Sequence, residues 1–242
     1  MSQGSNVKPI RVGFDMDGVV ADFSSAFREM EVRLFGPTPP MEPDLPEDEA
    51  ALEEGASERE RRPPPVPGLL EGRRRREAIW DAIHRTPDFW TLLKPLDPAA
   101  VPRIHALMLQ YGWEVFFITQ RPATTGDTVQ RQTQRWLRAQ GFDMPSVLVI
   151  SGSRGAAAGA LRLDYHVDDH AQHCVDVAAE SPAQPILIVP GRDEVTESGA
   201  RRLRIGIARS IGEALDVLER ASVRARRTPA LLSRLASLVT GR

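Results

Sequence analysis

Residues 10–23 read IRVGFDMDGVVADF, and this stretch decides the predicted fold. Its first part, Ile10–Phe14, is short, largely apolar and rich in branched side chains, which is typical of a buried strand. The run Asp15–Gly18 follows at once and predicts a tight loop. The sequence therefore predicts a buried strand that delivers two carboxylates into a loop at its end.

After Pro98 the apolar pattern alternates between helical and strand spacing. Strands separated by single helices imply parallel βαβ units. The predicted fold class is α/β, a three-layer α/β/α Rossmann-like parallel sheet. Helices are expected over 99–111, 128–140 and 156–161, and strands over 113–118, 147–150, 165–167, 185–189 and 203–208.

A small helical cap, residues 24–95, is expected between the first two strands of the sheet. Helical spacing covers residues 24–35 and resumes at about residue 73. Residues 37–68 carry many prolines and an acidic run but few large apolar side chains. Such a segment cannot offset its ordering entropy, so we expect a mobile insert there.

Residues 8–23 and 96–222 are then expected to form the catalytic core around the sheet. Towards the C-terminus, Ser210 and Glu213 have the spacing of a capping box that opens a helix. A C-terminal helix is expected over 223–242, where leucines form one stripe along 228–239. We expect this stripe to dock on the core, with a homodimer contact as the alternative.

Composition excludes several classes of protein. Lys and Arg total 31 against 33 Asp and Glu, so nothing in the net charge of −2 attracts nucleic acid or an anionic membrane. The single cysteine, Cys174, excludes an internal disulfide framework and a multi-cysteine metal site. No apolar run is long enough to span a membrane, and the N-terminus lacks a signal-peptide core. The expected location is cytoplasmic.

Acidic residues follow two of the predicted strands. Asp15 and Asp17 end the first strand, Thr119 ends the strand at 113–118, and Asp168 and Asp169 end the strand at 165–167. Ligands of open α/β sheets bind at the carboxyl ends of the strands, so these groups are expected to share one crevice. Clustered carboxylates must take up protons or bind a cation, and oxygen ligands without cysteine favour Mg²⁺ over zinc.

The same residues resemble motifs of the haloacid dehalogenase (HAD) superfamily. Residues 14–23 (FDMDGVVADF) resemble its first motif, 117–122 (FITQRP) its second, and 164–169 (DYHVDD) its fourth. Within the superfamily, DGVVADF and the return segment 88–96 (DFWTLLKPL) are similar to the 5′-nucleotidase branch, the cytosolic type of 5′(3′)-deoxyribonucleotidase.

This resemblance implies a Mg²⁺-dependent phosphomonoesterase. It implies that Asp15 attacks phosphorus to form an aspartyl phosphate, and that Asp17 protonates the leaving alcohol and later takes a proton from water. Thr119 would hold the phosphoryl oxygens, and Gln120 would contact the substrate. The implied magnesium ligands are Asp15, the Asp17 carbonyl, Asp168 and Asp169, and which of the last two touches the metal directly stays open.

One departure from the family pattern concerns the third motif, which normally supplies a lysine. The expected segment, 151–155, carries Arg154 instead, and neither lysine of the chain, Lys8 or Lys94, lies there. Arginine keeps the charge but is bulkier and forks onto two oxygens, so the exchange is not conservative. We expect activity that is retained but altered, and a non-catalytic phosphate-binding relative is the alternative.

The cap is expected to select the substrate. Thr119 lies 102 residues after Asp17, far more than the roughly 30 that a direct strand-helix-strand return needs. In the nucleotidases that the chain resembles, aromatic residues near the cap stack on the base, and Phe23, Phe89 and Trp90 match those positions, with Trp80 a weaker candidate. Packing of these rings in the core of the cap is the equal alternative.

Other polar residues are interpreted structurally. His166, His170 and His173 are expected to be sheet-end and helix-start residues, because a histidine metal cluster would compete with the Mg²⁺ site. The run Arg73–Arg76 is expected to be a solvated face, with a nucleic-acid end as the minor alternative. Cys174 is expected to be a packed thiol.

The first choice of function is a 5′-nucleotidase acting on (deoxy)nucleoside monophosphates. A HAD phosphatase for another small ester, such as a sugar phosphate, keeps the chemistry and changes the substrate, because the insert at 37–68 makes the cap unlike that of a compact nucleotidase. The expected partner is a small-molecule phosphate ester, with no membrane, and nucleic acid is kept only as the minor alternative at Arg73–Arg76.

Overall fold

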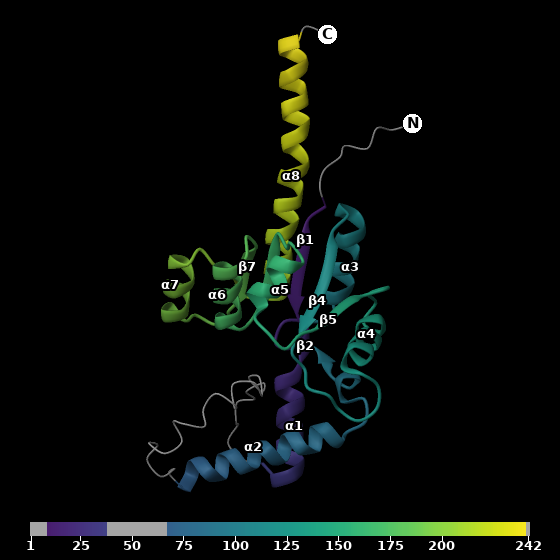
Figure 1. Cartoon of the computed structure of the whole chain (residues 1–242), viewed down its shortest axis with the longest axis vertical. Helices are drawn as coiled ribbons and strands as arrows, with labels where there is room; N and C mark the ends of the chain where they lie inside the picture. Colours follow the sequence, from purple (N-terminus) through teal and green to yellow (C-terminus); the bar gives the residue numbers. More distant parts are fainter. Residues whose placement is uncertain (1–8, 38–66, 241–242) are drawn as a thin grey trace. The chain divides into compact units, whose positions relative to one another are not determined.

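The computed structural model describes residues 9–37 and 67–240 of the chain, without the side chains at 67–70 and 226–240 (Figure 1). Almost all of the insert expected at 37–68 therefore lies outside the described residues. The chain divides into two compact units. Of the described residues, the first unit holds 9–14, 99–116 and 153–240, and the second holds 15–37, 67–98 and 117–152.

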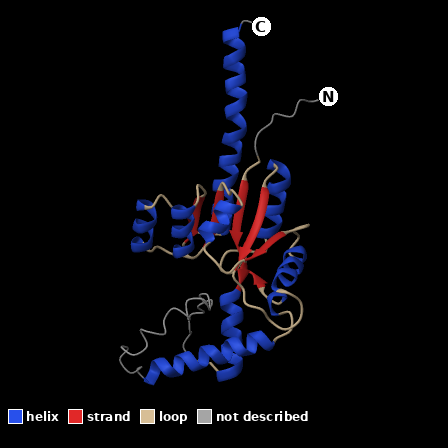
Figure 2. Cartoon of the chain, viewed as in Figure 1, coloured by secondary structure: helices blue, strands red, loops and turns tan. Residues whose placement is uncertain are grey.

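Six strands of the described chain form one sheet in the order β5-β4-β1-β6-β7-β8. Figure 2 shows the strands in red and the helices in blue. The pairs β1–β6, β6–β7 and β7–β8 are parallel. With helices on the faces of this parallel sheet, the predicted α/β class is confirmed. The strands are β1 (Arg11–Asp15), β4 (Glu114–Thr119), β5 (Ser146–Val149), β6 (Tyr165–Asp168), β7 (Gln184–Ile188) and β8 (Gly206–Ala208).

The first unit follows the predicted alternation of strand and helix. Its helices are α3 (Ala100–Tyr111), α5 (Arg154–Ala160), α6 (Ala171–Glu180), α7 (Glu194–Arg202) and α8 (Ile211–Thr240). Helix α5 has the sequence RGAAAGA and packs closely on α6: a Cβ atom at Gly155 would lie 2.2 Å from the carbonyl oxygen of Asp176. The small residues of α5 thus bring its first residue, Arg154, deep into the unit.

Two elements near the C-terminus differ from expectation. Helix α7 is not predicted, because its exposed Val195 leaves it without an apolar stripe; its N-cap, Asp193, accepts hydrogen bonds from two backbone N–H groups. The strand expected over 203–208 consequently begins only at Gly206. Helix α8 runs unbroken from 211 to 240, so the separate helix expected over 223–242 is its continuation as far as residue 240. The side chains of the leucine stripe at 228–239, and with them its expected docking or homodimer contact, lie outside the described residues.

The capping box at the start of α8 is present in a shifted form. Ser210 Oγ accepts a hydrogen bond from the N–H of Glu213, as predicted, at 3.2 Å. The carboxylate of Glu213 accepts from the N–H of Arg209, at 2.6 Å, rather than from that of Ser210. The box therefore satisfies a donor one residue further from the helix than the standard motif.

The second unit contains the helices that follow β1 as far as residue 98, together with α4. They are α1 (Phe23–Phe35), α2 (Pro67–Arg85) and the 3₁₀ helix η3 (Phe89–Thr91), followed by α4 (Val129–Ala139); β2 (Ala21–Asp22) pairs antiparallel with β3 (Lys94–Pro95). Asp22 caps α1 by accepting from the N–H of Ser25 at 2.9 Å. This unit contains the described part of the predicted cap, residues 24–95, and also α4 and β5, which the sequence assigns to the core. The division into core and cap therefore stays a prediction.

A loop next to η3 depends on one carboxylate. Asp88 has a left-handed backbone, with φ of 52°, and its side chain accepts a hydrogen bond from the N–H of Asp127 at 2.8 Å and pairs with Arg135 at 2.9 Å. Gly126, at φ of 101°, leaves room for it, since a Cβ atom there would lie 2.4 Å from the carboxylate. The Asp127 N–H, followed by Arg135, lowers the pKa of Asp88.

We predict that Asp88→Asn lowers the melting temperature at neutral pH and that this difference disappears in acid. Because the pKa of Asp88 is lower in the folded chain, its contribution is present above the ordinary aspartate value of about 3.9 and is lost as the pH falls through the folded value. Thermal unfolding from pH 7 to acid, with the exposed Asp143→Asn as control, measures the effect. A difference that persists at the lowest pH contradicts the prediction.

Candidate functional site

Two carboxylates lie at the ends of neighbouring parallel strands. Asp15 is the last residue of β1 and Asp168 the last residue of β6. The register of the pair joins Phe14 to Val167, so both strands deliver an aspartate at their carboxyl ends. Asp15 is 4% exposed and Asp168 is fully buried. Buried charges of one sign need partners or a cation.

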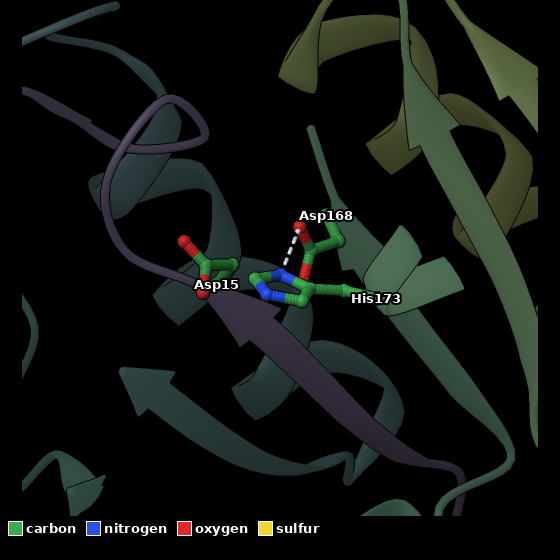
Figure 3. A group of neighbouring side chains, drawn as sticks. All are labelled: Asp15, Asp168 and His173. Atoms are coloured by element: carbon green, nitrogen blue, oxygen red, sulfur yellow. Dashed lines mark hydrogen bonds and ion pairs between the residues drawn. The ribbon is translucent and has the colours of Figure 1, made fainter. Parts of the chain in front are cut away.

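Figure 3 shows the group that these aspartates form with His173, which comes from the first turn of α6. One ligand atom of each residue, two carboxylate oxygens and a ring nitrogen, lies within 4.8 Å of the others. Sequence reasoning interprets His173 as an ordinary helix-start residue. The signal that could have found it is its position five residues after Asp168, where one turn of helix returns the side chain to the strand end.

Asp168 is held by polar groups on every side. His166 Nε2 lies 3.0 Å from one carboxylate oxygen, and His173 Nδ1 lies 3.1 and 3.2 Å from the two oxygens. The N–H of His170 donates to Asp168 at 2.9 Å, which ties the start of α6 to the end of β6. Arg154 Nε lies 3.7 Å away, within ion-pair distance.

These contacts determine the charge of Asp168. Burial is the largest single influence and by itself raises the pKa of the carboxyl group. Hydrogen bonds with His166 and then His173, together with their charges, outweigh burial and hold the pKa of Asp168 well below its ordinary value. The contacts with His166 and His173 therefore favour the ionised form of this buried carboxylate.

The donor set of this group fits a divalent cation. The carboxylates of Asp15 and Asp168 supply the hard oxygen ligands that Mg²⁺ and Mn²⁺ accept. The imidazole of His173 adds a nitrogen ligand, which first-row transition metals accept more readily than Mg²⁺ does. Asp169, the other candidate of the pair, is exposed and supplies no atom to the group.

Asp17 belongs to a different contact. The loop after β1 turns tightly through Gly18, at φ of 83°, and the Asp17 side chain is 7% exposed. Arg121 donates from Nε and Nη2 to its two carboxylate oxygens at 2.8 and 2.7 Å. From the sequence, Arg121 is quoted only within the motif at 117–122 and is given no role. Its position two residues after the end of β4 is the signal that could have found it.

The remaining predicted residues lie at or next to the ends of elements, and Arg154, expected just before a helix over 156–161, is the first residue of α5. Thr119 ends β4, is 1% exposed, and uses its carbonyl to accept from the N–H of Ile150 at 2.9 Å. Gln120 follows it and is half-buried. Arg154 is the first residue of α5, directly after the N-cap Ser153, and is 2% exposed. The structure therefore brings Arg154 to Asp168, while Asp17 and Asp169 supply no side-chain ligand to the group in Figure 3.

The aromatic residues expected to stack on a base are packed on one another instead. Phe23, Phe89 and Trp90 are 3%, 4% and 0% exposed. Phe23 stacks on Trp80, with ring centroids 5.5 Å apart, and meets Phe89 and Trp90 edge-on or tilted. The indole N–H of Trp90 donates to the carbonyl of Pro122 at 2.9 Å. These rings form a core, which is the alternative that the sequence left open.

Two further predictions are resolved by burial. Cys174 is fully buried, as expected of a packed thiol. The arginine run at 73–76 is only in part a solvated face: Arg73 pairs with Glu77 at the surface, whereas Arg75 pairs with the buried Glu31 at 3.4 Å.

Among the described residues, no helix combines the length and the apolar character that a membrane crossing requires.

Comparison with known proteins identifies the fold. No family model and no curated protein matches the chain. A solved protein from Thermotoga maritima described as a β-phosphoglucomutase is similar, with a TM-score of 0.50 and 19% identity over 87% of this chain and 99% of that one. A haloacid dehalogenase-like family protein from Streptococcus pneumoniae is similar with a TM-score of 0.50 and 13% identity, over 87% and 98%. At these identities the comparison shows a common fold, that of HAD-like proteins.

We predict that His173→Ala raises the dissociation constant for Mn²⁺ by at least about tenfold, because it removes a nitrogen ligand. Titration calorimetry and the electron paramagnetic resonance spectrum of Mn²⁺ measure the loss. The control is His170→Ala: its ring lies 4.6 Å from that of His173 but supplies no atom to the group. Equal losses in the two variants would show that His173 is not a ligand.

Proposed function

We propose that the chain is a divalent-cation-dependent phosphomonoesterase in which Asp15 is the nucleophile. The observation that carries this proposal is the grouping of the buried carboxylates of Asp15 and Asp168 with His173 at the carboxyl ends of two parallel strands. Such a site places one carboxylate where it can react and another where it can share a cation. The motifs that resemble the HAD superfamily and the HAD-like fold support the same chemistry.

The proposed reaction has two displacements. A carboxylate oxygen of Asp15 attacks phosphorus, and the bond from phosphorus to the ester oxygen breaks as that oxygen takes a proton from Asp17, the role that the resemblance implies for it. Water then gives a proton to Asp17 and attacks the aspartyl phosphate, which releases inorganic phosphate and restores the carboxylate of Asp15. Thr119 would hold a phosphoryl oxygen, and the guanidinium of Arg154 would supply positive charge near the site.

The cation would be held by Asp15 and Asp168, with His173 as a nitrogen ligand. When bound, Mg²⁺ or a similar ion would offset the negative charge of the carboxylates and of the incoming phosphate. Asp168 would serve as an ionised ligand, since its hydrogen bond with His166 lowers its pKa. The hydrogen bond from the His170 N–H would fix the orientation of that carboxylate.

Two substrate classes fit this chemistry. The resemblance to the 5′-nucleotidase branch favours nucleoside monophosphates, and this is the first candidate. A sugar phosphate is the second, and a specific observation favours it: Phe23, Phe89 and Trp90, the proposed base platform, are buried against one another. A screen of nucleotides and sugar phosphates, with and without Mg²⁺, separates the two classes by the rates of phosphate release.

We predict that Asp15→Asn lowers phosphate release by at least about a thousandfold, because the amide cannot form the acyl phosphate. Release of inorganic phosphate from the best substrate of the screen measures the loss, and the melting temperature verifies that the variant folds. Asp143→Asn, an exposed change, serves as control. Full activity of Asp15→Asn would refute the proposed mechanism, and binding of phosphate esters by the wild type without turnover would favour a non-catalytic relative.

A further inference from the structure

The carboxylate of Asp168 is held at both of its oxygens. His166 Nε2 lies 3.0 Å from Oδ2, and the backbone N–H of His170 donates to Oδ1 at 2.9 Å. All three residues belong to the first unit. A carboxylate has about four acceptor positions, so these two contacts leave one position on each oxygen. Together they determine the rotation of the carboxylate about its Cβ–Cγ bond.

His173 approaches the same carboxylate in a different way. Its Nδ1 lies 3.1 Å from Oδ1 and 3.2 Å from Oδ2, so it is shared between the two oxygens. The side chain of His173 is 20% exposed, whereas those of His166 and Asp168 are buried. The contact of Asp168 with His173 is therefore open to solvent on one side, and the contact with His166 is made inside the unit.

The sheet provides space for the buried ring of His166. Residues 166 and 168 lie two apart on β6, so their side chains point to the same face of the sheet. The residues directly opposite His166 are Gly13 on β1 and Pro185 on β7, and they share that face. Glycine has no side chain and proline only a compact ring, so the neighbouring strands leave room for an imidazole.

The polar contacts of His166 favour a role at Asp168 over a purely structural one. Its Nδ1 has no hydrogen-bond partner among the residues that the structure describes. A buried polar atom without a partner costs free energy, so stability alone would favour an apolar side chain at this position. The hydrogen bond that His166 does make is the one with Asp168.

We infer that His166 is a positioning residue, which holds Asp168 in the orientation that receives a divalent cation and does not bind the cation itself. A carboxylate oxygen only accepts, so the hydrogen of this contact is on Nε2, and that nitrogen offers no lone pair to a metal. His173 differs, because it supplies a ligand atom to the group in Figure 3. The inference rests on the cation site of the proposed function.

The first test replaces the donor and then restores it. His166→Phe keeps a ring but removes the hydrogen bond, and it is expected to raise the dissociation constant for Mn²⁺ by about 10–100-fold, the usual effect of losing an outer-shell partner. His166→Gln, whose amide can donate from nearly the same place as Nε2, is expected to recover most of the affinity. Titration calorimetry and the electron paramagnetic resonance signal of free Mn²⁺ measure both changes, at a temperature where all the proteins are folded.

The matched control is His105→Phe on α3, which is expected to bind Mn²⁺ like the wild type. If His166 has only a structural role, His166→Phe changes the melting temperature but leaves the dissociation constant for Mn²⁺ unchanged. That result would overturn the inference, while the proposed cation site and the phosphatase would stand.

A second measurement uses the wild type and does not depend on the folding of any variant. Proton–nitrogen correlation spectra of the imidazoles are recorded as a diamagnetic cation, Mg²⁺ or Zn²⁺, is added. His166 is expected to keep its Nε2–H signal at saturation, whereas the Nδ1 signal of His173 shifts. Loss of the Nε2–H signal would show that His166 is itself a ligand and that the inference is wrong. If the wild type binds no divalent cation, the proposed cation dependence fails and the inference with it.

Discussion

The structure depends on the cost of burying carboxylates. Asp15, Asp17 and Asp168 are each less than a tenth exposed, and a buried carboxylate is tolerated only when it is paired, hydrogen-bonded or bound to a cation. The chain meets this requirement in two ways. Asp17 takes both of its hydrogen bonds from one arginine, whereas Asp168 is surrounded by two imidazoles, a backbone N–H and the guanidinium of Arg154. The two aspartates are therefore stabilised by different kinds of partner.

The partners of the two aspartates also differ in whether they can share the carboxylate with a metal ion. The partners of Asp168 are side chains that can share it with a metal, because an imidazole nitrogen can turn from hydrogen bonding to coordination. The partner of Asp17 offers no such exchange, because a guanidinium only donates.

A glycine and a backbone hydrogen bond outside the ligand group position its side chains. Gly155 lets α5 approach α6 so closely that Arg154 reaches Asp168, and the His170 N–H fixes the start of α6 on the end of β6. Within the second unit, Trp90 is packed among aromatic rings and supports Arg121 with its face. The aromatic cluster therefore helps to fix the arginine that pairs with Asp17, in addition to the apolar area that it buries.

The sequence by itself determined the class of fold and the strand ends that carry acids. The apolar run before Asp15 and the alternation of strands and helices after Pro98 are local patterns, and local patterns predict which residues are buried and in which element. Helix α7 is not predicted because its sequence lacks such a pattern. Only the tertiary structure decided which polar groups meet: Arg121 reaches Asp17 across 104 residues, and His173, rather than Asp169, joins Asp15 and Asp168. Periodicity records burial but carries no information about the partner, because the partner is set by strand order and helix packing between distant segments of the chain.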